Sequence, residues 1–195
     1  SKQLAFSAAN KLFLADVETG SVKEVNETPG GHSIAEFSPD GKWLVLTMRD
    51  KEANADVYLF NIAEKKFINM TKNPFRDTGG ELTPDGKFLI FRSDREGGVN
   101  HLFKVALAKL AEDPDDPLVK ERMKKEEEGR GRDKEKEAAA APPGLSVDPD
   151  GIERRAIQIT TGTNAVGDFF LSRDGKTITF EKGPKGIPIP PGGQG

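Results

Sequence analysis

One phrase occurs three times in this chain and constrains the fold more than any other feature. Each copy has an apolar run, a short polar turn and a second apolar run. The turn reads Pro-Asp-Gly-Lys in the first two copies, whose prolines, Pro39 and Pro84, are 45 residues apart. In the third copy Arg173 takes the place of the proline, 89 residues after Pro84. A recurring unit of this kind indicates a fold built from repeated hairpins.

The turn residues have a structural explanation. Proline pre-sets φ at the second position of a β-turn, aspartate bonds back to the backbone, and glycine accepts the positive φ that follows. Asp40, Asp85 and Asp174 could be mistaken for catalytic acids, but the turn accounts for their spacing without any chemistry. We therefore interpret these three aspartates as turn residues.

A period near 45 residues with a hairpin in every unit is typical of the four-stranded blades of a β-propeller. Aligning the copies and following the alternation of apolar residues predicts an all-β fold with thirteen strands, or about three antiparallel blades, incomplete at both ends. The predicted strands cover residues 2–6, 11–16, 22–25, 33–37, 43–48, 56–62, 67–70, 78–82, 87–92, 101–106, 155–159, 167–171 and 176–180.

This pattern divides the chain into four parts. We expect propeller blades over residues 1–107, a charged insertion or linker over 108–153, a continuation of the propeller over 154–182 and a tail rich in Pro and Gly over 183–195. Because propellers close with about four or more blades, we expect a piece of a larger propeller. Its open edges should pair with other chains, so we expect self-association as well as binding to the rest of a parent chain.

The insertion is strongly charged. Its centre, residues 112–137, holds 8 basic and 11 acidic residues. Residues 117–128 could form a short exposed helix that begins with proline, and the remainder has the composition of a disordered segment. The insertion is either a segment that docks a partner or a solvent-exposed loop at the outer edge of the propeller. Residues 148–153 resemble a calcium loop only superficially, and we interpret them as the turn into the next strand.

Composition excludes several classes of function. The net charge of −3 argues against a basic nucleic-acid surface, and no apolar run approaches the length of a membrane span. The chain has no cysteine, no Gly-x-Ser-x-Gly elbow and no phosphate-binding loop. Its two histidines, His32 and His101, have no partner constellation in the sequence. We therefore expect no catalytic residue, no metal and no cofactor in this chain.

Two glutamates are the only candidate site residues. Glu36 and Glu81 occupy equivalent positions in the strands that should line the central channel, where small residues such as Ala35, Gly79 and Gly80 let the blades approach the axis. A channel lined with carboxylates could select peptides by charge. The third copy has Phe170 at this position, and plain solvent-facing glutamates are the alternative interpretation.

The hairpins, followed by Asp56-Val-Tyr-Leu-Phe and His101-Leu-Phe-Lys-Val, resemble the TolB-type, WD-like propeller repeats. The insertion, closed by Val147-Asp-Pro-Asp-Gly-Ile-Glu-Arg-Arg155, is similar to that of bacterial tricorn-like peptidases. This resemblance implies a non-catalytic propeller that gates or guides peptides to a serine peptidase domain outside this chain, in a cytoplasmic or periplasmic bacterial protein.

Two alternatives remain open. One is a TolB-like propeller that binds a protein partner without enzymatic activity. The other is the propeller cap of a prolyl-oligopeptidase-type hydrolase or of an amidohydrolase fusion. The expected partners are peptides or a protein, with no nucleic acid.

Overall fold

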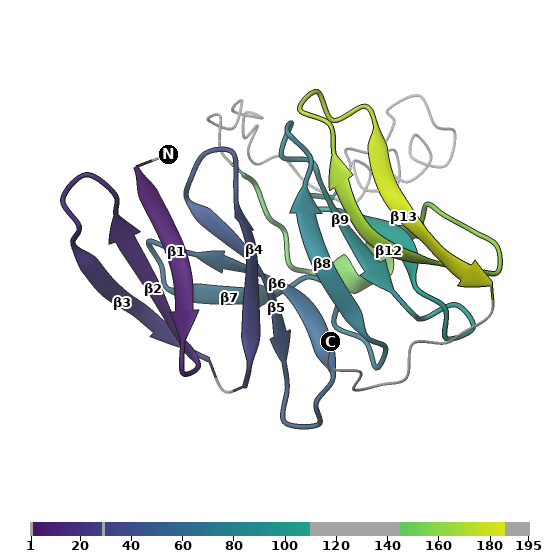
Figure 1. Cartoon of the computed structure of the whole chain (residues 1–195), viewed down its shortest axis with the longest axis horizontal. Helices are drawn as coiled ribbons and strands as arrows, with labels where there is room; N and C mark the ends of the chain where they lie inside the picture. Colours follow the sequence, from purple (N-terminus) through teal and green to yellow (C-terminus); the bar gives the residue numbers. More distant parts are fainter. Residues whose placement is uncertain (1, 29, 110–144, 186–195) are drawn as a thin grey trace, which may run out of the picture.

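A computed structural model describes residues 2–28, 30–109 and 145–185, and these residues form four antiparallel sheets. Figure 1 shows the sheets side by side in chain order, from purple to yellow. We call them blades 1 to 4. The elements are β1 (Gln3–Ala8), β2 (Lys11–Asp16) and β3 (Val22–Glu27) in blade 1; β4 (His32–Phe37), β5 (Trp43–Arg49), β6 (Ala55–Asn61) and β7 (Lys66–Asn69) in blade 2; β8 (Asp77–Leu82), β9 (Phe88–Ser93), β10 (His101–Ala106), the 3-10 helix η1 (Ile152–Arg155) and β11 (Ala156–Gln158) in blade 3; and β12 (Asn164–Leu171) and β13 (Ile178–Lys185) in blade 4.

The strand order confirms the all-β partial propeller. In blades 2 and 3 every strand pairs with the next along the chain, and blade 1 begins at the position that β5 holds in blade 2. Most strand boundaries differ from prediction by one or two residues, and the differences in the last three strands are as follows. The strand predicted at residues 167–171 begins at Asn164, and the last strand extends to Lys185. The strand predicted at residues 155–159 is shortened because η1 occupies Ile152–Arg155.

The hairpin turns form as the sequence predicts. In the first turn the hydroxyl of Ser38 donates to Asp40 at 2.6 Å, and Asp40 accepts the backbone N–H of Lys42 at 3.1 Å. Gly41 has a φ of 70°, the left-handed conformation that glycine adopts without strain. The same bonds recur at Thr83–Asp85 and Ser172–Asp174. The three turn aspartates are therefore structural.

The core consists of three apolar layers, one between each pair of neighbouring blades. Strand β5 is buried on both faces. Its residues Leu44 and Leu46 pack toward blade 1, while Val45 packs toward blade 3. A strand that is buried on both faces carries an almost continuous apolar run. The buried members of the layers are Leu12, Val25, Leu44, Leu46, Met48 and Phe60 between blades 1 and 2; Val45, Val57, Leu59, Met70, Leu82, Leu89, Phe91, Phe103, Val105, Leu107 and Ile152 between blades 2 and 3; and Ile90, Leu102 and Val166 between blades 3 and 4.

Glycine lets blades 2 and 3 approach each other. A Cβ atom on Gly80 would lie 2.6 Å from Val57 Cγ1 and 2.7 Å from Val45 Cγ1. Both distances are far below van der Waals contact, so no larger residue fits without displacing β5 and β6. Packing between blades 2 and 3 therefore requires glycine at position 80, while the expected approach of the blades to the axis stays a prediction.

The end of the predicted insertion belongs to the core. Ile152 is 1% exposed, and Leu145 and Val147 pack against the layer between blades 2 and 3. The backbone N–H of Leu145 also donates to Asp40 Oδ2 at 3.2 Å, which joins this segment to the first turn. We therefore propose that the inserted segment ends before Leu145. The helix predicted at residues 117–128 lies outside the described residues.

Candidate functional site

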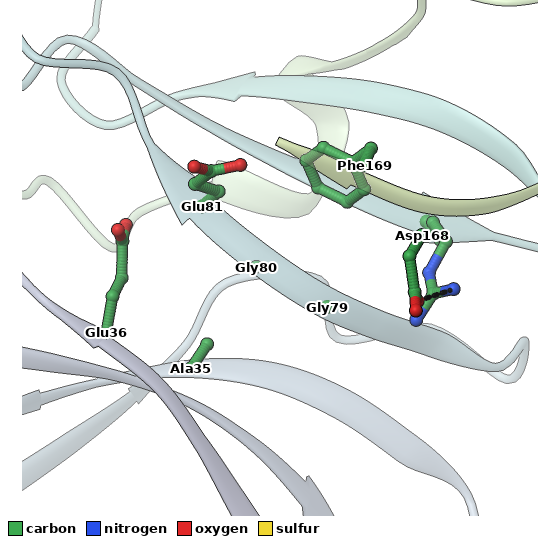
Figure 2. A pocket seen from close by; sticks show the side chains of 8 residues that line it. Ala35, Glu36, Gly79, Gly80, Glu81, Asp168 and Phe169 are labelled. Carbon is green, nitrogen blue, oxygen red and sulfur yellow. Dashed lines mark hydrogen bonds and ion pairs between the residues drawn. The ribbon is translucent and has the colours of Figure 1, made fainter. Parts of the chain in front are cut away.

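The first strands of blades 2, 3 and 4, which are β4, β8 and β12, lie next to one another, and we call them the inner strands. They border a cavity of about 230 Å³. Its lining includes Ala35 and Glu36 of β4, Gly79 and Glu81 of β8, and Phe169 of β12. Figure 2 shows Glu36 and Glu81 reaching the same region from neighbouring strands. The structure thus brings together the two glutamates that the sequence singled out.

Glu36 bridges two blades. Its carboxylate accepts the backbone N–H of Leu82, the residue that follows Glu81 in the next inner strand. The strand is irregular at Ala35, since the pairing register of β4 with β5 shifts between Ile34 and Glu36. Burial raises the pKa of Glu36 to about 7; the negative charge of Glu81 adds to this effect, and the Leu82 N–H opposes it. Glu36 is therefore only partly ionised at neutral pH.

Glu81 makes the equivalent contact one blade further on. Its Oε2 accepts the backbone N–H of Leu171, the matching residue of β12, at 3.0 Å. A register shift between Thr78 and Glu81 includes the two glycines of β8. We call this repeated carboxylate-to-N–H contact the inter-blade clamp. The sequence did not reveal it, although the equal spacing of Glu36 and Glu81 was its signal.

The clamp does not continue past blade 4. Phe170 stands at the position of the two glutamates and is 60% exposed. Phe170 has no side-chain oxygen to accept a backbone N–H as the two glutamates do. The inter-blade clamp therefore joins blade 2 to blade 3 and blade 3 to blade 4, and blade 4 offers no carboxylate at this position.

An ion pair lies on another side of the cavity and was not predicted from the sequence. Arg92 Nη1 donates to Asp168 Oδ1 at 3.0 Å, and the arginine side chain is largely buried while the aspartate is exposed. A Cβ on Gly79 would lie 3.2 Å from Arg92 Nη2, and the φ of Gly79 is +64°. Arg92 Nε is buried and has no hydrogen-bond partner among the described residues.

The two histidines lie apart from this cavity. His32 Nδ1 lies 2.8 Å from the hydroxyl of Thr28, and burial lowers the pKa of His32. His101 is buried, and its Nδ1 lies 3.4 Å from Thr160 Oγ1. Within residues 2–28, 30–109 and 145–185, no group of three or more His, Asp or Glu side chains could hold a metal ion.

A buried ionic network in blade 3 was also missed by the sequence analysis. Asp77 is fully buried and pairs with Arg95, whose Nη2 lies 3.0 Å from Asp77 Oδ2. The guanidinium of Arg95 also lies over the rings of Phe91 and Phe103, at 5.4 and 4.7 Å from their centroids. Because Asp77 and Arg95 are each other's partner, we interpret this network as one that holds the blade together.

The successive antiparallel sheets define a segment of a β-propeller. The chain belongs to the TolB β-propeller domain family, whose sequence pattern matches residues 4–111. No helix in the part of the chain that the structure describes has the length and apolar character needed to cross a membrane.

Curated relatives fall in two groups. The chain is 30% identical over 89 residues to the Tol-Pal system protein TolB of Wolinella succinogenes, a match that covers 46% of this chain and 21% of that protein. It is 31% identical over 86 residues to tricorn protease homolog 1 of Streptomyces coelicolor, covering 44% of this chain and 8% of that protein. The chain thus corresponds to a small part of each relative.

Solved structures support the same fold. TolB from Acinetobacter baumannii superposes with a TM-score of 0.61 at 22% identity, over 92% of this chain and 34% of that one. The tricorn protease superposes with a TM-score of 0.56 at 14% identity, over 93% of this chain and 23% of that one. At these identities the likeness concerns the fold alone.

Proposed function

We propose that this chain is the non-catalytic propeller part of a tricorn-like serine peptidase and that its inner strands guide peptide substrates toward a catalytic domain outside residues 1–195. The observation that carries this proposal is the cavity bordered by the inner strands of three successive blades. The relation to tricorn protease homolog 1 and the similarity of residues 147–155 to tricorn-like peptidases support the peptidase part.

The charges of the cavity favour cationic peptides. Three carboxyl groups line it: those of Glu36, which is partly ionised, of Glu81, and of Asp168, which pairs with the guanidinium of Arg92. Each glutamate uses one carboxylate oxygen in the inter-blade clamp. The remaining oxygens can accept hydrogen bonds from an ammonium or guanidinium group of a passing peptide.

Peptide binding can be tested with a charge-matched panel. Fluorescence anisotropy should show that lysine-rich peptides bind more tightly than glutamate-rich peptides of equal length, and that salt weakens the difference. Glu81→Gln retains an acceptor for the Leu171 N–H but removes the charge, so affinity for the lysine-rich peptide should fall about threefold to tenfold. The control Glu27→Gln, at an exposed position of β3, should leave the affinity unchanged.

The relation to TolB of Wolinella succinogenes favours a second candidate, a protein-binding propeller without enzymatic activity. A peptidase assay on the intact polypeptide that contains this chain separates the two. Cleavage of peptides together with labelling by a serine-directed fluorophosphonate supports the tricorn-like function. Peptide binding without cleavage or labelling supports the TolB-like function, and absence of peptide binding contradicts the role of the inner strands.

A further inference from the structure

A second hollow lies at the rim where blades 2 and 3 meet. It measures about 850 Å³ and shares no lining residue with the cavity of the inner strands. Side chains from residues 50–54, between β5 and β6, and from residues 70–76, between β7 and β8, border it together with Asp94, which follows β9. Blades 2 and 3 each have all four strands, so this hollow lies between two complete sheets. We call it the rim groove.

The connection between β7 and β8 departs from the repeat. Residues 70–76 carry two cationic side chains and a phenylalanine, whereas the equivalent connections, residues 28–31 and 159–163, contain no charged and no aromatic residue. The phenylalanine, Phe75, lines the rim groove and is 44% exposed. Since the other blades are joined without these side chains, the fold does not require them, and they are candidates for recognition of a ligand.

Hydrogen bonds hold this connection in place. Asn73 Oδ1 accepts the backbone N–H of Phe75 at 2.8 Å, and Asn54 Nδ2 donates to the carbonyl of Asn73 at 2.8 Å. Asp94 Oδ1 accepts the backbone N–H of Arg76 at 2.9 Å. These bonds join the borders of the rim groove to one another. Phe75 and Arg76 are therefore carried by backbone that is ordered before a ligand arrives, which lowers the entropic cost of binding.

The cationic side chains of the rim groove can bind an anionic group. Arg49, Lys72 and Arg76 line the groove, and none of these side chains makes a hydrogen bond or an ion pair with another of the described residues. A guanidinium group binds a carboxylate through two parallel hydrogen bonds, a geometry that an ammonium group does not offer. The two arginines are accordingly the main candidates for contact with a carboxylate.

The acids of the rim groove are partly occupied. Asp50 Oδ1 accepts the backbone N–H groups of Glu52 and Asn54, each at 2.9 Å. Asp94 likewise uses one oxygen for a backbone N–H, and both oxygens of the buried Asp56 accept side-chain donors. Four acids and three cations line the groove, which disfavours a simple anion. A peptide suits it better, because a peptide brings a carboxylate for the cations together with N–H donors for the free carboxylate oxygens.

We propose that the rim groove binds a peptide carboxylate that stands next to an apolar side chain. The carboxylate contacts Arg49 and Arg76, and the apolar side chain packs on Phe75. The peptide N–H groups donate to the free oxygens of Asp50 and Asp94. A chain terminus and an acidic side chain present the same two oxygens, so either can supply the carboxylate. This inference concerns a different surface from the inner-strand cavity and does not rest on the proposed function.

The test measures the fluorescence anisotropy of labelled peptides with the 195-residue chain. Three probes are built from glycine and serine with one phenylalanine. The first ends in phenylalanine with a free carboxylate, the second is its carboxamide, and the third is a carboxamide with a glutamate before the phenylalanine. The first should bind about tenfold more tightly than the second, because they differ only in the carboxylate. The third supports a side-chain source if it matches the first, and a terminal source if it matches the second.

Chain variants assign the binding to the rim groove. Arg49→Gln and Arg76→Gln should each weaken binding of the first probe about fivefold to tenfold, and Phe75→Ser about threefold. The control Lys51→Gln removes a positive charge from the same connection as residues 50–54 but from a side chain that does not line the groove, so it should change affinity less than about twofold. Equal binding of the first two probes, no binding of any probe, or equal effects of Lys51→Gln and Arg76→Gln would overturn the proposal.

Discussion

The pKa of Glu36 makes the stability of the propeller segment depend on pH in a defined direction. In the folded chain this pKa is about 7, against an ordinary value of 4.5. A raised pKa means that the folded state holds the proton more tightly than the unfolded state. The contribution of Glu36 to stability is therefore fully present below pH 4.5 and is lost as pH rises through 7.

The size of this effect follows from the same values. A difference of one pH unit in pKa corresponds to about 1.4 kcal/mol, so the full difference is worth ~3 kcal/mol. Because the Glu36 side chain is only partly buried, solvent screens its charge, and we expect about half of this, ~1.5 kcal/mol. A carboxyl oxygen of Glu36 can accept the Leu82 N–H whether or not the group is protonated, so the loss of stability comes mainly from burial of the charge and to a smaller extent from the charge of Glu81.

The measurement compares the chain with Glu36→Gln by urea unfolding between pH 4.5 and 8.5. Glutamine can accept the same N–H but does not titrate, so the free energy of unfolding of the variant relative to the original chain should rise by ~1.5 kcal/mol across this range. The comparison cancels other buried acids such as Asp77, whose pKa is also raised by burial. A difference that stays constant with pH, or that falls as pH rises, would refute the reasoning.

Three further predictions concern packing. Gly80→Ala should lower the free energy of unfolding by about 1–3 kcal/mol through overpacking against Val45 and Val57, whereas Gly31→Ala, with open space around it, should change it little, as measured by urea unfolding. Arg95→Ala should cost about 3–5 kcal/mol because it leaves Asp77 buried without its partner, and a cost below 1 kcal/mol in the same assay would contradict that. Ile152→Ala should lower the melting temperature by an amount corresponding to about 2–5 kcal/mol, while Ile157→Ala at an exposed site should have little effect.

Residues that act locally were predictable from the sequence. The turn around Asp40 needs only neighbours within a few positions, and its bonds form as expected. The strand order was also predictable, because the three copies of the repeat align without a structure. The core residues were predictable from the same repeats, because a strand that is buried on both faces has a nearly continuous apolar sequence.

Residues that act between blades were not predictable in the same way. Glu36 and Glu81 were selected as equivalent positions, but alternation alone could not show that each reaches an N–H of the next blade. Arg92 and Asp168 are 76 residues apart, and nothing local in either segment indicates their contact. The hydrogen bond from the Leu145 N–H to Asp40 Oδ2 joins residues 105 positions apart, and it could not be predicted for the same reason. These contacts depend on how neighbouring sheets are rotated relative to each other, which local sequence patterns do not specify.

The chain leaves blade 3 and re-enters it at nearly the same point. The backbone N–H of Asp148 donates to the carbonyl of Leu107 at 2.9 Å, and Lys109 Nζ lies 3.2 Å from Asp148 Oδ2. We call these two contacts, which lie outside residues 110–144, the stem. Because the stem holds the two ends together and loop closure entropy grows only slowly with length, the length of residues 110–144 can change with little effect on the blade. This stem is accordingly a natural attachment point, where a reporter or an affinity module could be exchanged for residues 110–144 while the strand order on either side is kept.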